Sequence, residues 1–134
     1  MKFQKVRNKE MGMKIVRDIL LYLLVAFYLF MGSMHLIRPE QYFPMMPSWL
    51  PAHPVLILLS GIMEILLAIL LIPAKTRIIS AKLIIVLLIV FFFAIHVPQS
   101  INYYKTANPD FVASIVRLPI QLLFIAWAWL FTKT

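Results

Sequence analysis

The segment VLILLSGIMEILLAILLI (Val55–Ile72) decides the fold, because its eighteen residues contain one charged side chain, Glu64. At about 1.5 Å per residue, a helix of this length covers roughly the hydrocarbon thickness of a bilayer. A carboxylate at that depth is costly unless it is protonated, paired or turned toward a polar interior, so an intramembrane acid is a candidate functional residue. The segment therefore predicts a transmembrane helix with Glu64 as a candidate site residue.

The composition of the chain is typical of a membrane protein. Of its 134 residues, 63% are hydrophobic and 13% are charged, and the mean hydropathy is +0.91. A water-soluble domain of this length cannot bury so much apolar surface. Cysteine is absent, which excludes disulfides, thiolate metal sites and cysteine nucleophiles. Any redox role would therefore need a bound cofactor or a partner protein.

Three further apolar runs accompany the first, so the chain is predicted to be a single domain with four spans, at about residues 15–37, 55–73, 77–97 and 112–132. The short turn 73–77 makes the second and third spans antiparallel neighbours. The connection 38–54 contains five prolines, which remove N–H donors and fix φ, and its aromatic residues suit the headgroup region. The predicted fold class is all-α: an antiparallel four-helix transmembrane bundle with a proline-rich outer cap loop between the first two helices.

The third span is expected to end near Pro98, because proline removes a backbone N–H donor. The residues Ile101–Asp110 would then form a polar outer loop that includes Tyr103 and Tyr104. This loop would connect the third span to the fourth.

Basic residues are distributed unequally between the two ends of the spans. Six precede the apolar run Ile19–Ile37, two occupy the turn 73–77, and Lys82 and Lys133 complete one side, so ten of the 13 lysines and arginines gather there. The other connections contain Arg38 and Lys105. The positive-inside rule then predicts a multi-pass plasma-membrane protein with both termini cytoplasmic. The net charge of +8 therefore reports orientation in the bilayer rather than nucleic-acid binding, and the basic N-terminal stretch is interpreted as a topogenic, lipid-facing segment.

The polar residues of the spans fall in the outer half of the predicted bundle. Counted from the outer boundary, Glu64 and Gln121 lie roughly 15 Å deep and Arg117 roughly 9 Å deep. His35 and His96 lie within a turn of that boundary. Because all four helices contribute, we expect these five residues to form a ligand-binding site in which Glu64 contacts Arg117 or Gln121, directly or through water.

Each of these residues also has a structural explanation. Glu64 and Arg117 could be an ion pair that only locks two helices, the histidines could bond to loop carbonyls, and Gln121 could join helices. The pair Ser60-Gly61 more simply allows close contact between helices. A metal site is disfavoured because the depths of the candidate ligands differ and no close-spaced pair exists. No catalytic residue can be assigned from the sequence.

A series of short motifs runs along residues 14–131. They are Gly32 and His35, then Pro39, Phe43, Pro47 and Pro51, then Ser60-Gly61-x-x-Glu64, then Pro73 and Arg77, and finally Arg117-Leu118-Pro119-x-Gln121 with Trp127. In order and spacing they resemble the DoxX family of small four-helix integral membrane proteins. Where many members have Phe-Pro-Ala-Asn at the end of the third span, this chain has Phe93-Ala94-Ile95-His96, so a family role does not transfer to that position.

The resemblance implies a four-helix membrane fold and an association with membrane oxidoreductase systems, including quinone-linked thiosulfate oxidation and complexes for oxidative-stress defence. Our first hypothesis is a redox-associated subunit that binds a quinone or similar amphipathic molecule in the outer half of the bundle, together with soluble or membrane redox partner subunits. The alternatives are a non-catalytic binder or carrier of a lipid or hydrophobic ligand, and a structural assembly subunit of a membrane complex. A channel is disfavoured, since the polar residues offer no continuous path across the bilayer.

Overall fold

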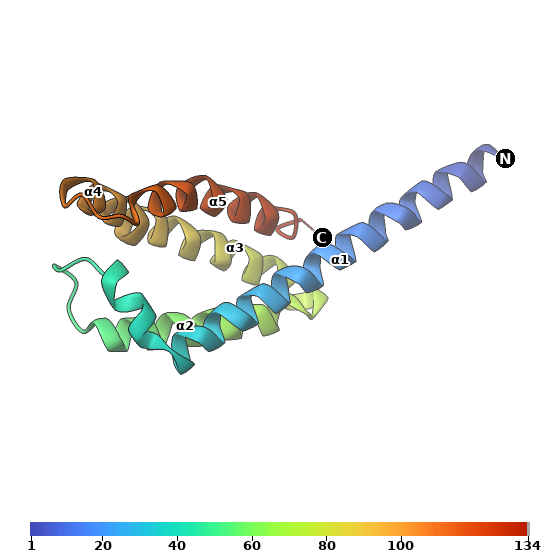
Figure 1. Ribbon diagram of the computed structural model, residues 1–134. Coiled ribbons are helices and arrows are strands. Elements are labelled where there is room, and N and C mark those ends of the chain that lie inside the picture. Colours follow the sequence, from blue (N-terminus) through green and yellow to red (C-terminus); the bar gives the residue numbers. More distant parts are fainter. Residues whose placement is uncertain (134) are drawn as a thin grey trace.

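The computed structural model describes residues 1–133, and within them it contains helices and connections but no strand (Figure 1). In chain order the elements are α1 (Lys2–Ile37), the 3₁₀-helix η1 (Pro39–Met45), α2 (His53–Leu71), α3 (Ala74–Phe91), the π-helix η2 (Phe92–His96), α4 (Val97–Lys105) and α5 (Phe111–Trp129). The predicted all-α class is confirmed.

Four helical stretches are long and apolar enough to cross a membrane: Lys2–Ile37, His53–Leu71, Ala74–Lys105 and Phe111–Trp129. In the most apolar window of α2 33% of the residues are buried, and in that of α5 only 17%. A helix that leaves most of its apolar side chains uncovered is suited to hydrocarbon, where its backbone groups are satisfied internally. The prediction of a multi-pass membrane protein with four spanning helices is supported.

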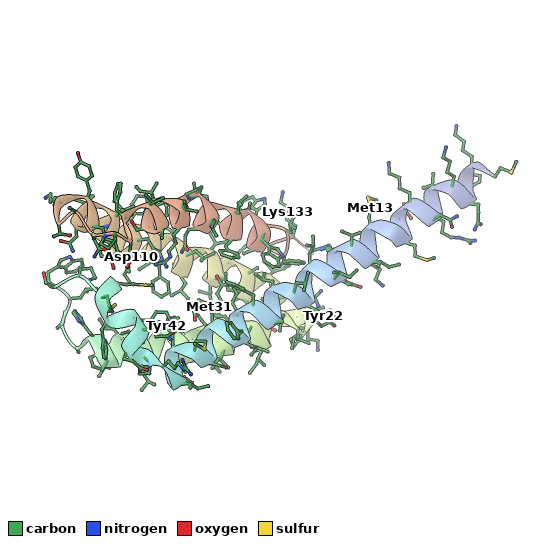
Figure 2. The ribbon with its side chains drawn as sticks, viewed as in Figure 1. Met13, Tyr22, Met31, Tyr42, Asp110 and Lys133 are labelled. Carbon is green, nitrogen blue, oxygen red and sulfur yellow. The ribbon has the colours of Figure 1, made fainter. Side chains whose placement is uncertain are left out.

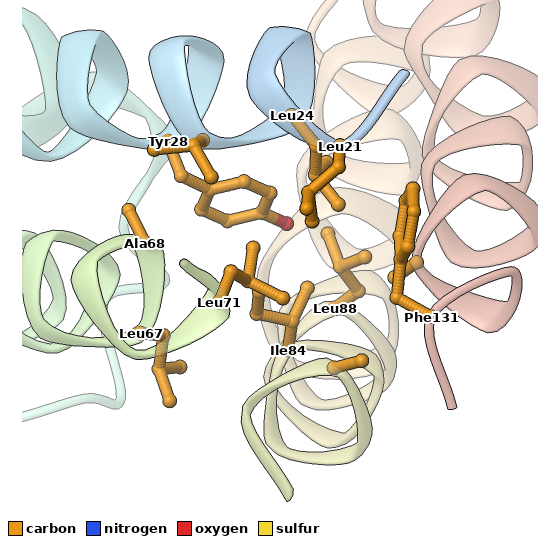
Figure 3. Packing of buried hydrophobic residues seen from close by; sticks show 12 residues of the cluster. Leu21, Leu24, Tyr28, Leu67, Ala68, Leu71, Ile84, Leu88 and Phe131 are labelled. Atoms are coloured by element: carbon orange, nitrogen blue, oxygen red, sulfur yellow. The ribbon is translucent and has the colours of Figure 1, made fainter. Parts of the chain in front are cut away.

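An apolar core lies where α1, α2, α3 and the end of α5 meet (Figure 3). Leu24 of α1, Leu71 of α2 and Ile84 of α3 are fully buried there, and Phe131 closes the core just after α5. The buried hydroxyl of Ser80 in α3 donates to the carbonyl of Leu67 in α2, with 2.5 Å between the oxygens. This core joins the helices at the end of the molecule opposite η1 (Figure 1).

The turn between α2 and α3 is short, as its sequence indicates. Only Ile72 and Pro73 separate the two helices. The side chain of Arg77 donates hydrogen bonds to the carbonyls of Leu71 and Ile72, at 2.9 and 2.7 Å, so it caps the C-terminus of α2. Such capping satisfies carbonyls that would otherwise lack partners at a helix end.

Two helices are longer than the sequence predicts. α1 begins at Lys2 rather than near residue 15, and its N-terminal part projects beyond the other helices (Figure 1). The third span also continues through Pro98 to Lys105, so the prediction of a loop beginning at Ile101 was wrong. Proline is tolerated in the first turn of α4, where few backbone N–H groups have helical partners, and the preceding π-helix changes the hydrogen-bond register.

Candidate functional site

The closest contact between ionisable side chains at the candidate site joins α1 to α2. Nδ1 of His35 lies 3.2 Å from Oε2 of Glu64, and the two side chains are 11% and 9% exposed. The same Nδ1 lies 2.7 Å from the carbonyl oxygen of Met31, one turn earlier in α1. A carbonyl only accepts hydrogen bonds, so Nδ1 carries a hydrogen and Nε2 is the nitrogen left to exchange a proton.

Two glycines allow α1 and α2 to approach each other at this point. A Cβ atom placed on Gly61 would lie 2.6 Å from Cβ of His35, and one placed on Gly32 would lie 2.7 Å from the carbonyl oxygen of Gly61. Real side chains do not tolerate such distances, so any larger residue would push the helices apart. Small residues have this role at helix crossings in membranes. The interpretation of Ser60-Gly61 as a close-contact site therefore agrees with the structure.

The 3₁₀-helix η1 packs against the His35–Glu64 pair through Tyr42. The ring of Tyr42 stacks on the imidazole of His35, with ring centroids 4.0 Å apart and planes inclined by 13°. Figure 2 shows Tyr42 near the end of α1 that carries Met31. Burial raises the pKa of Tyr42, the Glu64 carboxylate raises it further and the Arg117 guanidinium opposes the rise. The phenol therefore stays protonated at neutral pH and can donate a hydrogen bond.

Arg117 of α5 belongs to a second group of polar side chains. One guanidinium nitrogen, Nη1, donates to Oε1 of Gln99 at 3.4 Å and to the sulfur of Met45 at 3.3 Å. The amide of Gln99 in turn donates to the hydroxyl of Tyr103 at 3.2 Å. The bond from Arg117 to Gln99 is long for its kind, so it is weak. Because Met45 and Tyr42 both belong to η1, this short helix bridges the Arg117 group and the His35–Glu64 pair.

Gln121 connects α5 to α3. Its amide donates to the carbonyl of Leu88 at 3.2 Å, four residues before the π-helix begins. Among residues 1–133, neither Gln121 nor Arg117 forms a hydrogen bond or ion pair with Glu64. The helix crossing at the glycines instead pairs Glu64 with His35, while Arg117 and Gln121 bond to α4 and α3, and a contact to Glu64 through water stays a prediction.

Within the described part of the chain, three buried side-chain atoms lack a hydrogen-bond partner: Oε2 of Glu64, Nδ1 of His96 and Oγ of Ser100. Unsatisfied buried polar atoms are rare in native proteins and each requires an explanation, such as water, a ligand or a functional role. His96 and Ser100 are four residues apart, so they share a face across the junction of η2 and α4. The structure therefore presents unsatisfied polar atoms near both parts of the site.

Sequence reasoning missed several residues of this site. Gln99, Ser100 and Tyr103 are buried on α4, and Tyr42 and Met45 are partly buried on η1. Tyr103 was assigned to a polar loop, and Gln99 and Ser100 to the connection between the third span and that loop. Their spacing from His96 of three, four and seven residues is that of one helix face and could have revealed them. No such periodic signal exists in the proline-rich segment of η1.

The site is built from imidazole, carboxylate, phenol, guanidinium and amide groups. Over residues 1–133, no group of three or more histidine, cysteine, aspartate or glutamate side chains is placed to hold a metal ion. The arrangement can exchange protons through His35 and Glu64, and can donate hydrogen bonds from Tyr42 and Arg117 to an oxygen atom. Of the five residues predicted from the sequence, His35 and Glu64 form one group, Arg117 belongs to a second, Gln121 bonds to the backbone of α3, and Nδ1 of His96 has no partner among the described residues.

Comparisons with known proteins identify the family of the chain. Residues 24–132 match the profile of a family described as a domain of unknown function (DUF8561), and this match includes His35, Glu64, His96, Arg117 and Gln121. No curated protein and no solved structure matches the chain. The matched region covers most of the 134 residues. The protein therefore belongs to the DUF8561 family.

Proposed function

We propose that this protein is a redox-associated membrane subunit that binds a quinone or a similar amphipathic molecule at the polar site between η1, α1, α2 and α5. The single observation that carries the proposal is the buried pair of His35 and Glu64 beneath Tyr42. A structural core would more cheaply use apolar residues here, because removing charges from water costs more than a typical pair returns. The DoxX-like order of motifs supports the association with redox systems.

The chemistry of the site suits a ligand with carbonyl or hydroxyl oxygens and an apolar body. Tyr42 and Arg117 supply donors that can hold an oxygen atom, and His35 with Glu64 can accept or release a proton. The exposed apolar faces of α2 and α5 provide a surface for a ring or an isoprenoid tail. Electrons would come from a partner subunit, since the chain contains no cysteine for its own thiol chemistry.

The proposal includes an antiparallel four-helix transmembrane bundle in the plasma membrane. In it η1 and residues 46–52 form the outer cap, and both termini face the cytoplasm. Its support is the gathering of η1 and α4 at one end of the molecule, with the α2–α3 turn and the C-terminal end at the other (Figure 1). The basic residues of the N-terminal stretch and of that turn belong to the second end, as the positive-inside rule requires.

Mass spectrometry of small molecules that copurify with the protein in mild detergent tests the proposal. We expect a quinone with the wild-type protein and with Glu40→Gln, which makes the same chemical change at an exposed carboxylate of η1. Glu64→Gln should retain the fold but lose the quinone. A phospholipid or an isoprenoid without a redox-active ring would contradict the redox role and support a carrier of hydrophobic molecules.

A structural role is the second candidate, and the glycine crossing favours it. Gly32 and Gly61 bring α1 and α2 so close that the His35–Glu64 pair could serve only to lock their register. In that case no small molecule would copurify, and Glu64→Gln would lower stability with no further effect. A bound quinone that depends on Glu64 excludes this explanation.

A further inference from the structure

A groove lies beside the α1 helix, at the end of the molecule opposite the polar site. It has a volume of about 840 Å³ and runs between the projecting part of α1 and the residues that follow α5. Figure 2 shows Met13 and Lys133 at this end, away from Tyr42 and Asp110. Side chains from both segments line it, among them Lys9, Val16, Arg17, Leu20, Leu130 and Lys133. Among residues 1–133, cationic and apolar side chains border the groove and no acidic side chain lines it.

The three cationic side chains that line the groove differ in the contacts they make. Arg17 is anchored, because its Nη2 donates to the backbone carbonyls of Leu130 and Lys133, at 3.3 and 2.5 Å. The ammonium of Lys133 lies 5.5 Å from the centroid of the Trp129 ring. Lys9 forms no hydrogen bond or ion pair with the residues that the structure describes. The ammonium groups of Lys9 and Lys133 therefore line the same groove as an anchored guanidinium.

The acidic residues of this part of α1 do not neutralise the groove. Glu10 is exposed and does not line it. Asp18 lines a separate groove of about 430 Å³ together with Ile15, Ile19, Tyr22 and Leu23. Neither of these two acidic side chains therefore lies in the groove with the ammonium groups of Lys9 and Lys133.

The apolar side chains of the groove lie on its side nearer the apolar core. Val16 and Leu20 follow Lys9 along α1 toward the apolar core, and Leu130 faces them from the end of the chain. A ligand that fits must therefore have an anionic head and an apolar tail. Basic pockets at the cytoplasmic ends of transmembrane helices provide such a site for anionic lipid headgroups.

We propose that this groove binds an anionic phospholipid. The phosphate lies between Lys9 and Lys133, which give it charge-assisted hydrogen bonds, and an acyl chain lies on Val16, Leu20 and Leu130. The site is independent of the proposed quinone site, since no residue belongs to both. The proposal also goes beyond a topogenic role for the N-terminal charges. A topogenic role depends on how many basic residues are present, whereas this site requires Lys9 and Lys133 in particular.

Gly12 supplies a way to fill the groove without changing its charge. It lines the groove, and a Cβ placed on it would have no heavy atom within 4 Å. Gly12→Leu therefore adds bulk where the fold leaves space, and it replaces glycine by a better helix former. The variant tests occupancy of the groove without harming α1.

The experiment uses the full-length protein in nanodiscs of phosphatidylcholine mixed with phosphatidylglycerol in equal amounts, followed by native mass spectrometry of retained lipids. We expect the double variant Lys9→Gln with Lys133→Gln to reduce retained phosphatidylglycerol by roughly tenfold or more, because each lysine near a lipid surface strengthens the binding of an anionic lipid. We expect a loss of the same size for Gly12→Leu, because its side chain fills the groove. Lys2→Gln with Lys5→Gln removes the same charge from residues that do not line the groove, so it should change retention less than about twofold if the groove itself holds the lipid.

Three results would overturn the proposal. Equal losses in the two lysine double variants would mean that diffuse charge attracts the lipid. Equal retention of phosphatidylcholine and phosphatidylglycerol by the wild-type protein would mean that the groove does not select an anion. Displacement of phosphatidylglycerol by inorganic phosphate alone would make the site one for a free anion rather than for a lipid.

Discussion

Gly61 lies so close to Gly32 that a Cβ atom added to Gly61 would stand 2.8 Å from the carbonyl oxygen of Gly32. This approach of the α1 and α2 backbones places His35 and Glu64 within 3.2 Å of each other. The polar pair therefore depends on the absence of two side chains that would otherwise separate the helices.

Gly61→Ala should destabilise the protein and loosen the pair. The added Cβ would meet Cβ of His35 at 2.6 Å, and overpacking of this kind costs about 1–3 kcal/mol. Thermal unfolding in detergent, followed by tryptophan fluorescence, measures the loss. Gly12→Ala is the matched control, because open space surrounds that position and alanine favours the helix. Equal destabilisation by the two substitutions would show that the crossing is not tightly packed.

A double-mutant cycle should locate the partner of Glu64. We expect Glu64→Gln and His35→Gln to show a coupling energy of about 1–3 kcal/mol, because the two side chains are in contact and buried. Glu64→Gln and Arg117→Gln should be additive within about 0.5 kcal/mol, since no hydrogen bond or ion pair between them occurs in residues 1–133. Unfolding free energies in detergent provide all the terms. A larger coupling to Arg117 than to His35 would contradict the arrangement of the site.

The stacking of Tyr42 on His35 predicts a difference between two substitutions. Tyr42→Phe keeps the ring and should leave stability nearly unchanged, whereas Tyr42→Ala should lose about 0.5–1.5 kcal/mol for the aromatic pair in addition to the buried area. Tyr104→Ala is the control for removal of an exposed ring, at 73% exposure. If Tyr42→Phe also abolishes quinone retention, the hydroxyl contacts the ligand. Destabilisation by Tyr104→Ala as large as that by Tyr42→Ala would remove the special role of the stack.

The proposed orientation predicts which connections are accessible from outside the cell. The chain lacks cysteine, so single cysteines can be introduced without first replacing native ones. A cysteine at Asn108, in the connection between α4 and α5, should react with a membrane-impermeant maleimide on intact cells. A cysteine at Lys75, in the first turn of α3, should react only after permeabilisation. The reverse pattern would invert the bundle and place the polar site on the cytoplasmic side.

The sequence was sufficient to predict the α-helical class and the four spanning helices. Long apolar runs carry that information locally, because a bilayer requires each span to satisfy its own backbone hydrogen bonds. The position of Glu64 in such a run also marked it as unusual without any knowledge of its neighbours. The end of the third span was mispredicted, since Pro98 has a different effect in the first turn of a helix than in its interior.

The pairing of the polar side chains was decided by the tertiary structure. Depth along each helix suggested Arg117 and Gln121 as partners of Glu64, but depth does not determine the direction in which a helix faces. The close crossing at Gly32 and Gly61 turns Glu64 toward His35, and η1 folds back so that Tyr42 covers the pair. Helix rotation and the fold of a proline-rich connection depend on packing between segments distant in sequence, so the local pattern of residues carries little information about them.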